Sequence, residues 1–331
     1  MSQALLLGVD GGGTKTEFVL IDRAGHLLAR HREPGSYHLQ VGIDGLRAVM
    51  ERGLAELFRR AGASADDVEH AFFGLPAHGE DSSLQPSLDA LPAPLLGHRR
   101  YRCGNDMICT WAGSLAGADG IGIVAGTGAI GYGERAGMAA RASGWGELFG
   151  DEGSAYWVAI QGLNAFSRMS DGRLPKGPLH GLVMREFGLR SELDLCARLM
   201  GPQVGRDEIA SFSGLVARAA GQGDATARAI FAAAGRELAQ VAEALRRTLG
   251  FEPGEAVPVS YSGGLFRSGE LVLAPLREQL AALSPTFELR EPVLGPGLGA
   301  ALYAARDAGN GLGTAAIAVL RQTEAALQPP A

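Results

Sequence analysis

A run of three glycines between two apolar segments strongly constrains how this chain can fold. The segment before the glycines, residues 4–10, ends on the carboxylate of Asp10. The segment after them, residues 16–22, is rich in β-formers and ends at a turn, so the glycines join two strands of a hairpin. Three positions without a Cβ let the backbone turn tightly and bring its N–H groups against a ligand. The pattern suggests a site for a metal and a polyphosphate, with a turn that binds nothing as the alternative.

Two familiar glycine motifs do not fit this turn. The Walker pattern needs Gly-Lys-Ser/Thr after its glycine loop, whereas Thr14 separates Gly13 from Lys15. The dinucleotide-binding fingerprint needs a third glycine where Thr16 stands. Lys15 is a candidate counter-charge for a phosphate, and an exposed lysine that points to solvent is an equally good interpretation.

The order strand-strand-strand-helix-strand-helix occurs twice in the predicted secondary structure. For the first copy we predict elements near residues 4–10, 16–22, 26–31, 43–61, 69–75, 84–91, 101–103 and 105–117. For the second copy we predict strands near 120–125 and on to about 143, a helix from about 151, and elements at 258–262, 270–283 and 287–290. The second copy carries a helical insertion at about 177–249, and helices near 297–307 and 311–323 close the chain. Two α/β lobes that each present a glycine turn imply a ligand held between them.

The second copy has its own turn of Gly126, Thr127 and Gly128 after a predicted strand. Residues 126–131 match GxGxxG, but a Rossmann fingerprint must open a helix, because the pyrophosphate lies on the helix N-terminus. The residues that follow contain too much glycine for a helix interior. N–H groups and hydroxyls from two hairpins could instead grip the β- and γ-phosphates from opposite sides.

Composition excludes several classes of protein. The chain of 331 residues carries a net charge of −6, which argues against a nucleic-acid or anionic-membrane surface. Cys103, Cys109 and Cys196 form no CxxC pair and suit a reducing compartment. No apolar stretch reaches the roughly 18 residues of a membrane span, and the first apolar run is too short for a signal peptide. We expect a cytoplasmic homodimer that binds neither nucleic acid nor membrane.

These motifs resemble those of the actin-like ATPase superfamily, which includes sugar kinases, heat-shock chaperones and actin. The match is to the two phosphate loops, residues 8–14 and 125–128, and to residues 259–264, a strand and glycine pair similar to the superfamily's adenosine-binding turn. Within the superfamily the chain resembles the N-acetylglucosamine kinases and the related BadF/BadG-type ATPases. That closer resemblance lies in residues 144–157, 223–225, 232–235 and 295–301.

The resemblance implies two ribonuclease-H-like lobes around an ATP cleft, with residues 1–118 and about 297–331 in the first lobe and 119–296 in the second. It implies an ATP-dependent kinase that phosphorylates a hydroxyl of an amino sugar, and we expect the 6-hydroxyl of N-acetylglucosamine. Mg²⁺ is the expected metal, with Asp10 as its carboxylate ligand. The implied ATP-binding residues are Gly11, Gly12, Gly13, Thr14, Lys15, Gly126, Thr127, Gly128, Gly263 and Gly264.

Asp106 is the candidate general base. It follows Asn105 at a predicted strand end and opens a helix, whose N-terminus stabilises a carboxylate. An ordinary helix cap is the alternative, but the family's catalytic aspartate lies at this position. The implied sugar-binding residues are His38, Asn105, Asp106, Gly144, Trp145 and Asp151. On sequence alone, a tryptophan near glycines is more often a core residue.

Two loops depart from the family pattern. Tyr37 stands where the family tends to place an asparagine, and His78 adds bulk to a loop that is usually small. Both loops would shape the pocket around the sugar's 2-substituent, so glucosamine or another hexose remains open.

Proteins of other classes remain as alternatives. A BadF-type ATPase that activates a partner dehydratase needs thiolates for an iron–sulfur cluster, but the cysteines lie outside the second phosphate turn and the helix after it. A sugar sensor without catalysis is a third interpretation. A zinc-containing repressor is disfavoured, because its cysteine cluster is missing.

Overall fold

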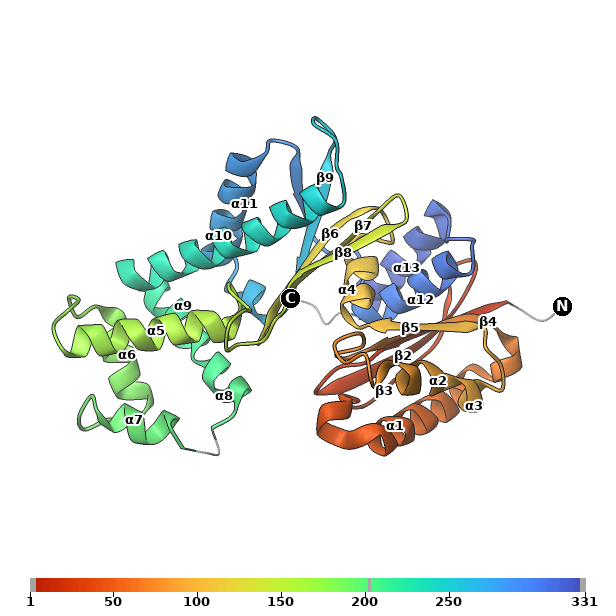
Figure 1. Cartoon of the computed structure of the whole chain (residues 1–331), viewed down its shortest axis with the longest axis horizontal. Coiled ribbons are helices and arrows are strands. Elements are labelled where there is room, and N and C mark those ends of the chain that lie inside the picture. Colours follow the sequence, from red (N-terminus) through yellow and green to blue (C-terminus); the bar gives the residue numbers. More distant parts are fainter. Residues whose placement is uncertain (1–3, 202–203, 328–331) are drawn as a thin grey trace. The chain divides into compact units, whose positions relative to one another are not determined.

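The computed structural model describes residues 4–201 and 204–327, which form two compact units. Residues up to Asp119 and from Glu291 onward belong to the first unit, and Gly120–Arg290 form the second. Each unit contains one five-stranded sheet with helices packed on it (Figure 1).

The sheet of the first unit has the strand order β3-β2-β1-β4-β5. Its strands are β1 (Leu5–Asp10), β2 (Lys15–Asp22), β3 (Leu27–Pro34), β4 (Val68–Leu75) and β5 (Tyr101–Asn105). The strands β1, β2 and β3 form an antiparallel meander, whereas β1, β4 and β5 are mutually parallel. The carboxyl ends of β1, β4 and β5 therefore meet at one edge of the sheet, where Asp10 lies opposite Gly74 and Leu75 opposite Asn105.

Helices cover both faces of this sheet, and the alternation of β1 explains why. Leu5, Leu7 and Val9 share a core with α1, whereas Leu6 between them shares a core with α12. The helices of this unit are α1 (His38–Ala61), η1 (Ala65–Asp67), α2 (Gln85–Ala90), α3 (Pro92–Leu96), α4 (Met107–Ser114), α12 (Pro296–Asp307) and α13 (Thr314–Leu327).

The sheet of the second unit has the order β10-β9-β6-β7-β8. Its strands are β6 (Gly120–Ala125), β7 (Ala129–Arg135), β8 (Met138–Ser143), β9 (Val257–Ser262) and β10 (Phe287–Arg290). Again the first three strands form an antiparallel meander and the last two run parallel to the first. Because the order matches that of the first unit, the α/β duplication predicted from the sequence is confirmed.

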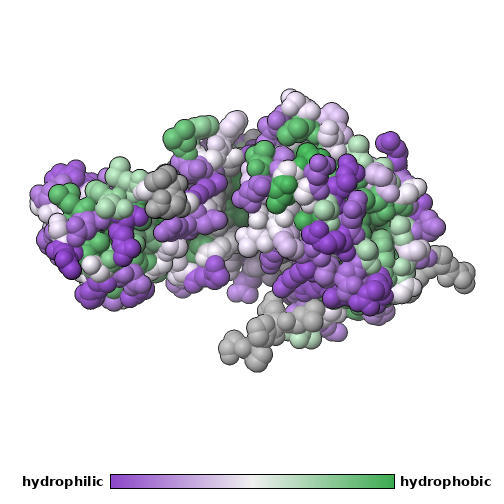
Figure 2. Space-filling model, turned by 90° about the horizontal axis from the view of Figure 1, so that it is seen from below, coloured by the Kyte–Doolittle hydropathy of each residue, from purple (hydrophilic) through white to green (hydrophobic). Residues whose placement is uncertain are grey.

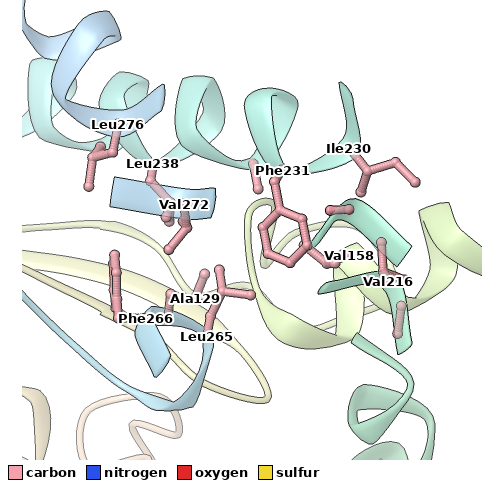
Figure 3. Close-up of a cluster of buried hydrophobic side chains, with 14 of the residues drawn as sticks. Ala129, Val158, Val216, Ile230, Phe231, Leu238, Leu265, Phe266, Val272 and Leu276 are labelled. Carbon is pink, nitrogen blue, oxygen red and sulfur yellow. The ribbon is translucent and has the colours of Figure 1, made fainter. Parts of the chain in front are cut away.

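The two helices that connect β8 to β9 and β9 to β10 are α10 (Ala225–Thr248) and α11 (Glu270–Leu283). A short helix, η2 (Gly264–Ser268), follows β9. The helices without a counterpart in the first unit are α5 (Ala155–Ser170), α6 (Pro178–Glu186), α7 (Asp194–Leu199), α8 (Arg206–Ser211) and α9 (Ser213–Gly221). Figure 3 shows Phe231 pointing from α10 toward Val158 of α5, with Leu265 of η2 nearby. The additional helices and the sheet thus share one core.

Several elements differ from those expected, among them α1, α3 and α5. The helix α1 begins at His38, and Gly42, with φ of +71°, interrupts its regular geometry. Residues 92–96 form α3 rather than a loop, since proline fits the first turn of a helix. The helix α5 begins at Ala155, because the Ser154 side chain caps it by accepting a hydrogen bond from the Trp157 N–H.

The face shown in Figure 2 is mostly hydrophilic, and hydrophobic residues occur on it in small groups. Within residues 4–201 and 204–327, no helix combines the length and apolarity needed to cross a bilayer. Three exposed apolar side chains, Trp145, Leu148 and Phe149, lie together in sequence in the loop between β8 and α5.

Candidate functional site

The predicted site residues fall into two sets, one in each unit. In the first unit, Asp10 ends β1, and Asp106 follows the end of β5. Gly74, near the end of β4, lies between them. A Cβ on Gly74 would lie 2.2 Å from Cys109 Sγ, 3.2 Å from Asp106 Cα and 3.3 Å from the Val9 carbonyl oxygen. The missing side chain at Gly74 therefore lets the start of α4 approach the end of β1.

The carboxyl group of Asp10 interacts electrostatically with Asp106. Desolvation, followed by the negative charges of Asp106 and Glu17, raises the pKa of Asp10 well above its ordinary value. The positive charge of Lys15, at the start of β2, acts in the opposite direction. Two carboxylates that repel one another form a site that a divalent cation would stabilise.

Asp106 occupies the N-cap position of α4, but its side chain does not cap the helix. The buried Asn105 does so instead, since its Oδ1 accepts a hydrogen bond from the Met107 N–H at 3.1 Å. The Nδ2 of Asn105 donates to the His78 carbonyl at 3.2 Å. The interpretation of Asp106 as an ordinary cap is therefore wrong, whereas its role as a base and the sugar contact of Asn105 stay predictions.

The first glycine turn is anchored on one side and open on the other. The Gly11 N–H donates to the Gly74 carbonyl at 2.8 Å, and a Cβ on Gly11 would lie 2.7 Å from that same oxygen. At Gly13 the nearest atom to a Cβ would be 3.9 Å away. Gly13, Thr14 and Lys15 are exposed. A phosphate could reach the turn from this open side.

The loop from β3 to α1 packs on this turn and contributes a residue that the sequence did not reveal. The Ser36 N–H donates to the Gly12 carbonyl at 2.9 Å. The Ser36 Oγ is buried and finds no hydrogen-bond partner within the described part of the chain. Next to it, the buried His38 lies edge-on to Tyr37, with ring centroids 5.8 Å apart. An unsatisfied buried hydroxyl beside the glycine turn is a group that a ligand can use.

In the second unit the structure brings the two remaining glycine turns together. The Gly126 carbonyl accepts a hydrogen bond from the Ala155 N–H at 2.8 Å, which ties this turn to the start of α5. Gly263 has a φ of +103°, and a Cβ there would lie 2.4 Å from the Ala125 carbonyl oxygen. Only glycine fits at this position, where the end of β9 meets the turn after β6.

A cavity of about 620 Å³ opens beside these turns. Thr127 and Gly264 line it, together with Asp207 of α8 and Gly214 of α9. Its size lies within the range of small-molecule sites, roughly 300–1,000 Å³. The sequence predicted the glycine turns and a helical insertion, but not the place of α8 and α9 beside the turns, since that depends on how the additional helices pack.

The predicted sugar segment forms the loop between β8 and α5. Gly144 has a φ of +76°, and a Cβ there would lie 2.7 Å from Ile130 Cδ1. The Trp145 side chain is 72% exposed, so it is not a core residue. Asp151 is buried and lies before α5 begins, with a φ of +59°. Contacts of these residues with a sugar stay predictions.

Asp151 is held by an arginine that the sequence analysis missed. Its Oδ1 accepts a hydrogen bond from the Gly146 N–H at 3.3 Å, and its Oδ2 forms an ion pair with Arg206 Nη2. The Nε of Arg206 also lies 3.2 Å from Glu147 Oε2. Desolvation raises the pKa of Asp151, although the Arg206 charge opposes that shift. A Cβ on Gly128 would lie 2.7 Å from both Arg206 Nη2 and Asp151 Oδ2, so this ion pair covers the glycine turn of residues 126–128.

The donor set at the first turn suits magnesium. The described residues contain no cluster of three or more His, Cys, Asp or Glu side chains that could hold a metal. Mg²⁺ does not require such a cluster, since it binds through one or two carboxylates, water and substrate phosphates. Asp10 is a carboxylate that could bind Mg²⁺ in this way, since the nearby charge of Asp106 destabilises its ionised form and a cation would offset that effect. Cys109 is buried and Cys103 is half-buried, and desolvation raises the pKa of both thiols.

Known proteins are similar to this chain over most of its length. Residues 7–304 match the model of the BadF/BadG/BcrA/BcrD ATPase family. The N-acetyl-D-glucosamine kinase of Dictyostelium discoideum is 30% identical over 314 residues, which cover 92% of this chain and 98% of that protein. The N-acetylmuramic acid/N-acetylglucosamine kinase of Clostridium acetobutylicum is 28% identical over 265 residues, which cover 80% of this chain and 86% of that protein.

The fold is also similar to a solved structure. The crystal structure of a candidate N-acetylglucosamine kinase from Chromobacterium violaceum superposes with a TM-score of 0.69 and 27% sequence identity. The similarity covers 91% of this chain and 99% of that one. The resemblance inferred from the motifs is thus confirmed, and the chain belongs to the BadF/BadG/BcrA/BcrD ATPase family.

Proposed function

We propose that the protein is an ATP-dependent kinase that phosphorylates the 6-hydroxyl of an amino sugar, with N-acetylglucosamine as the first choice. The observation that carries the proposal is the coupling of Asp10 and Asp106 at the carboxyl edge of the first sheet, beside the open side of a glycine turn. The names of the relatives in Dictyostelium discoideum and Clostridium acetobutylicum support a sugar as the acceptor.

The glycine turns would hold the nucleotide. N–H groups and hydroxyls of the first turn (Gly11, Gly12, Gly13, Thr14 and Lys15) and of the second (Gly126, Thr127 and Gly128) would bind phosphate oxygens. Gly264 lines the cavity of about 620 Å³, and Gly263 packs against the turn that follows β6. Both glycines would contact the nucleoside. Mg²⁺ would neutralise phosphate charge, and the Asp10 carboxylate would orient it through its water ligands.

Asp106 would act as the general base. Phosphoryl transfer passes through a loose transition state, so the base accepts the proton late. As the sugar oxygen bonds to phosphorus and the bond to the β-phosphate oxygen breaks, the Asp106 carboxylate takes the hydroxyl proton, and ADP leaves. Asn105 caps α4, so the carboxylate of Asp106 is not needed as a helix cap.

The loop between β8 and α5 carries several of the proposed sugar-binding residues. The exposed face of Trp145 suits the apolar face of a pyranose, and Asp151 can accept hydrogen bonds from its hydroxyls. Gly144, His38 and Asn105 complete the proposed sugar-binding residues. Tyr37 and His78, in the two loops that depart from the family pattern, would decide which 2-substituent fits.

A panel of acceptors tests this proposal. N-acetylglucosamine, N-acetylmuramic acid, glucosamine and glucose are each incubated with ATP and Mg²⁺, and ADP release is followed in a coupled assay. The highest kcat/KM is expected for N-acetylglucosamine, with the phosphate placed on the 6-hydroxyl by nuclear magnetic resonance of the product. Failure with every sugar would favour an ATPase that activates a partner enzyme.

We also infer a homodimer, for which light scattering should give twice the chain mass of 34.4 kDa.

A further inference from the structure

Two neighbouring side chains of α8 contact the second phosphate turn. The Asp207 Oδ1 accepts a hydrogen bond from Thr127 Oγ1 at 2.7 Å, and Arg206 pairs with Asp151 directly over Gly128. We propose that these residues set the affinity of this turn for nucleotide in opposite directions, with Arg206 raising it and Asp207 lowering it. The proposal rests on the proposed function, in which the turn binds a polyphosphate.

Asp207 competes with a phosphate for the Thr127 hydroxyl. A threonine hydroxyl has one proton to donate, and here Asp207 receives it. A phosphate oxygen bound at the turn would need that same proton. An ionised carboxylate can only accept hydrogen bonds and repels a phosphate, and Asp207 also lines the adjoining cavity. Nucleotide binding therefore requires the Thr127–Asp207 hydrogen bond to break.

Arg206 has the opposite effect because it neutralises acidic groups at the turn. Asp151 is 3% exposed, and its Oδ2 would lie 2.7 Å from a Cβ on Gly128. Without Arg206, that carboxylate would remain as a buried negative charge at the surface that receives the phosphates. The same guanidinium also lies 3.2 Å from Glu147, so one cation serves two carboxylates.

A purely structural role for α8 predicts a different outcome. If the contacts of Arg206 and Asp207 served only to hold α8 against the turn, the loss of either would loosen the cavity and weaken nucleotide binding. Opposite changes in nucleotide affinity on substitution of Arg206 and of Asp207 would therefore distinguish the proposed roles from a purely structural one.

The test measures the Kd of β,γ-imido-ATP with Mg²⁺ by calorimetry, using the full chain. Asp207→Asn should bind the analogue roughly three- to tenfold more tightly, because the charge is removed. Arg206→Gln should bind it roughly tenfold more weakly, because Asp151 is left uncompensated. Both shifts should shrink as the salt concentration rises, since both groups reach solvent. Asp207→Ala provides a second variant if Asp207→Asn does not fold.

Matched controls lie on the same helices. Glu208→Gln changes the adjacent exposed acid of α8, and Arg218→Gln changes an exposed arginine of α9, paired with Glu186. Neither should move Kd. The double variant Asp151→Asn/Arg206→Gln should recover the affinity that Arg206→Gln loses, because both charges are then absent.

Two outcomes would overturn the roles proposed for Arg206 and Asp207. One is weakened or unchanged binding in both Asp207 variants, and the other is a double variant that binds no better than Arg206→Gln. A wild-type chain that binds no nucleotide would instead refute the proposed function, and the two kinds of failure are therefore distinguishable.

Discussion

Gly299 of α12 packs against Gly113 of α4 so closely that a Cβ on Gly299 would lie 2.4 Å from the Gly113 amide nitrogen. The same Cβ would lie 2.0 Å from the Cys109 carbonyl oxygen. Nearby, the rings of Trp111 and Tyr303 join the two helices edge-on, with centroids 6.2 Å apart. The helix α12, far away in the sequence, therefore sets how deeply α4 lies in the first unit, and with it the position of Asp106.

Replacement of Gly299 by alanine should disturb both stability and activity. The added methyl must push α12 from α4, and overpacking of this kind costs about 1–3 kcal/mol of unfolding free energy. Thermal unfolding should show a lower midpoint, and kcat should fall as α4 shifts. Gly311→Ala is the control, since no atom lies within 4 Å of a Cβ at that position. Equal midpoints for Gly299→Ala and Gly311→Ala would contradict this packing role.

Local patterns sufficed to predict the two sheets. The apolar runs 4–10 and 120–125 each lead into a glycine turn and a second strand, and hairpins of this kind are specified by neighbouring residues. The close approach of Gly299 to Gly113 could not be predicted in this way. In the sequence both residues are only poor helix formers. Their missing side chains allow a close approach only once two helices remote in the chain are packed together.

The functional site likewise combines residues that local motifs predict with residues whose place depends on tertiary packing. Asp10 and the glycine turns are local motifs, and the structure places both turns of the second unit beside one cavity. Arg206 and Ser36 escaped detection because neither belongs to a motif. The role of Arg206 depends on the packing of α8, and that of Ser36 on the burial of a hydroxyl without a partner. Such contacts follow from tertiary structure.

Asp106→Asn should separate chemistry from binding. Loss of a general base typically lowers turnover by roughly 10²–10⁴, whereas the KM for ATP should change little. The substitution keeps the size of the side chain and leaves the cap supplied by Asn105 in place. Asp44→Asn, at an exposed position of α1, serves as the control and should turn over like the wild type. Near-normal kcat in Asp106→Asn would refute the assignment.

Asp10→Asn should stabilise the protein while it abolishes activity. Because the folded pKa of Asp10 is raised, its ionisation opposes folding at neutral pH; this cost begins to fall as pH drops below the raised value and is gone below the ordinary aspartate pKa. Removal of the charge should therefore increase stability at neutral pH by about 0.5–2 kcal/mol, the range common for a stabilising substitution. The gain should shrink in acid, and stabilisation by ATP with Mg²⁺ should be lost. A thermal unfolding midpoint of Asp10→Asn below that of the wild type at pH 7 would contradict the expected cost of ionising Asp10.

Trp145→Ala should affect the sugar and not the nucleotide. Loss of an aromatic face from a sugar site should raise the sugar KM roughly tenfold, with the KM for ATP unchanged. Stability should hardly change, since the side chain is 72% exposed. Leu148→Ala, at an 88% exposed position of the same loop, is the matched control. An unchanged sugar KM in Trp145→Ala would exclude the tryptophan from the sugar site.

Glu17 should make the stability of the first unit dependent on pH. Its carboxylate is 3% exposed and accepts hydrogen bonds from Arg30, both at 2.9 Å, and from Arg32 at 2.6 Å. Burial alone would raise the pKa of Glu17, but these hydrogen bonds and charges outweigh it and lower the pKa. The stabilisation is therefore complete above the ordinary glutamate pKa of about 4.3 and is lost as pH falls through the lowered folded value.

Glu17→Gln should accordingly reduce the unfolding free energy at pH 7 by about 2–3 kcal/mol, less than for a fully buried pair, because Arg32 is 57% exposed. Urea unfolding between pH 7 and pH 3 should show a difference between wild type and variant that stays constant down to about pH 5 and then narrows. Glu56, whose pKa is lowered to about 2 by Arg59 and Arg60 on the exposed face of α1, provides the contrast. Since solvent screens exposed pairs, Glu56→Gln should change stability little. A Glu17→Gln difference that persists unchanged to pH 3 would show that packing, and not charge, accounts for the loss.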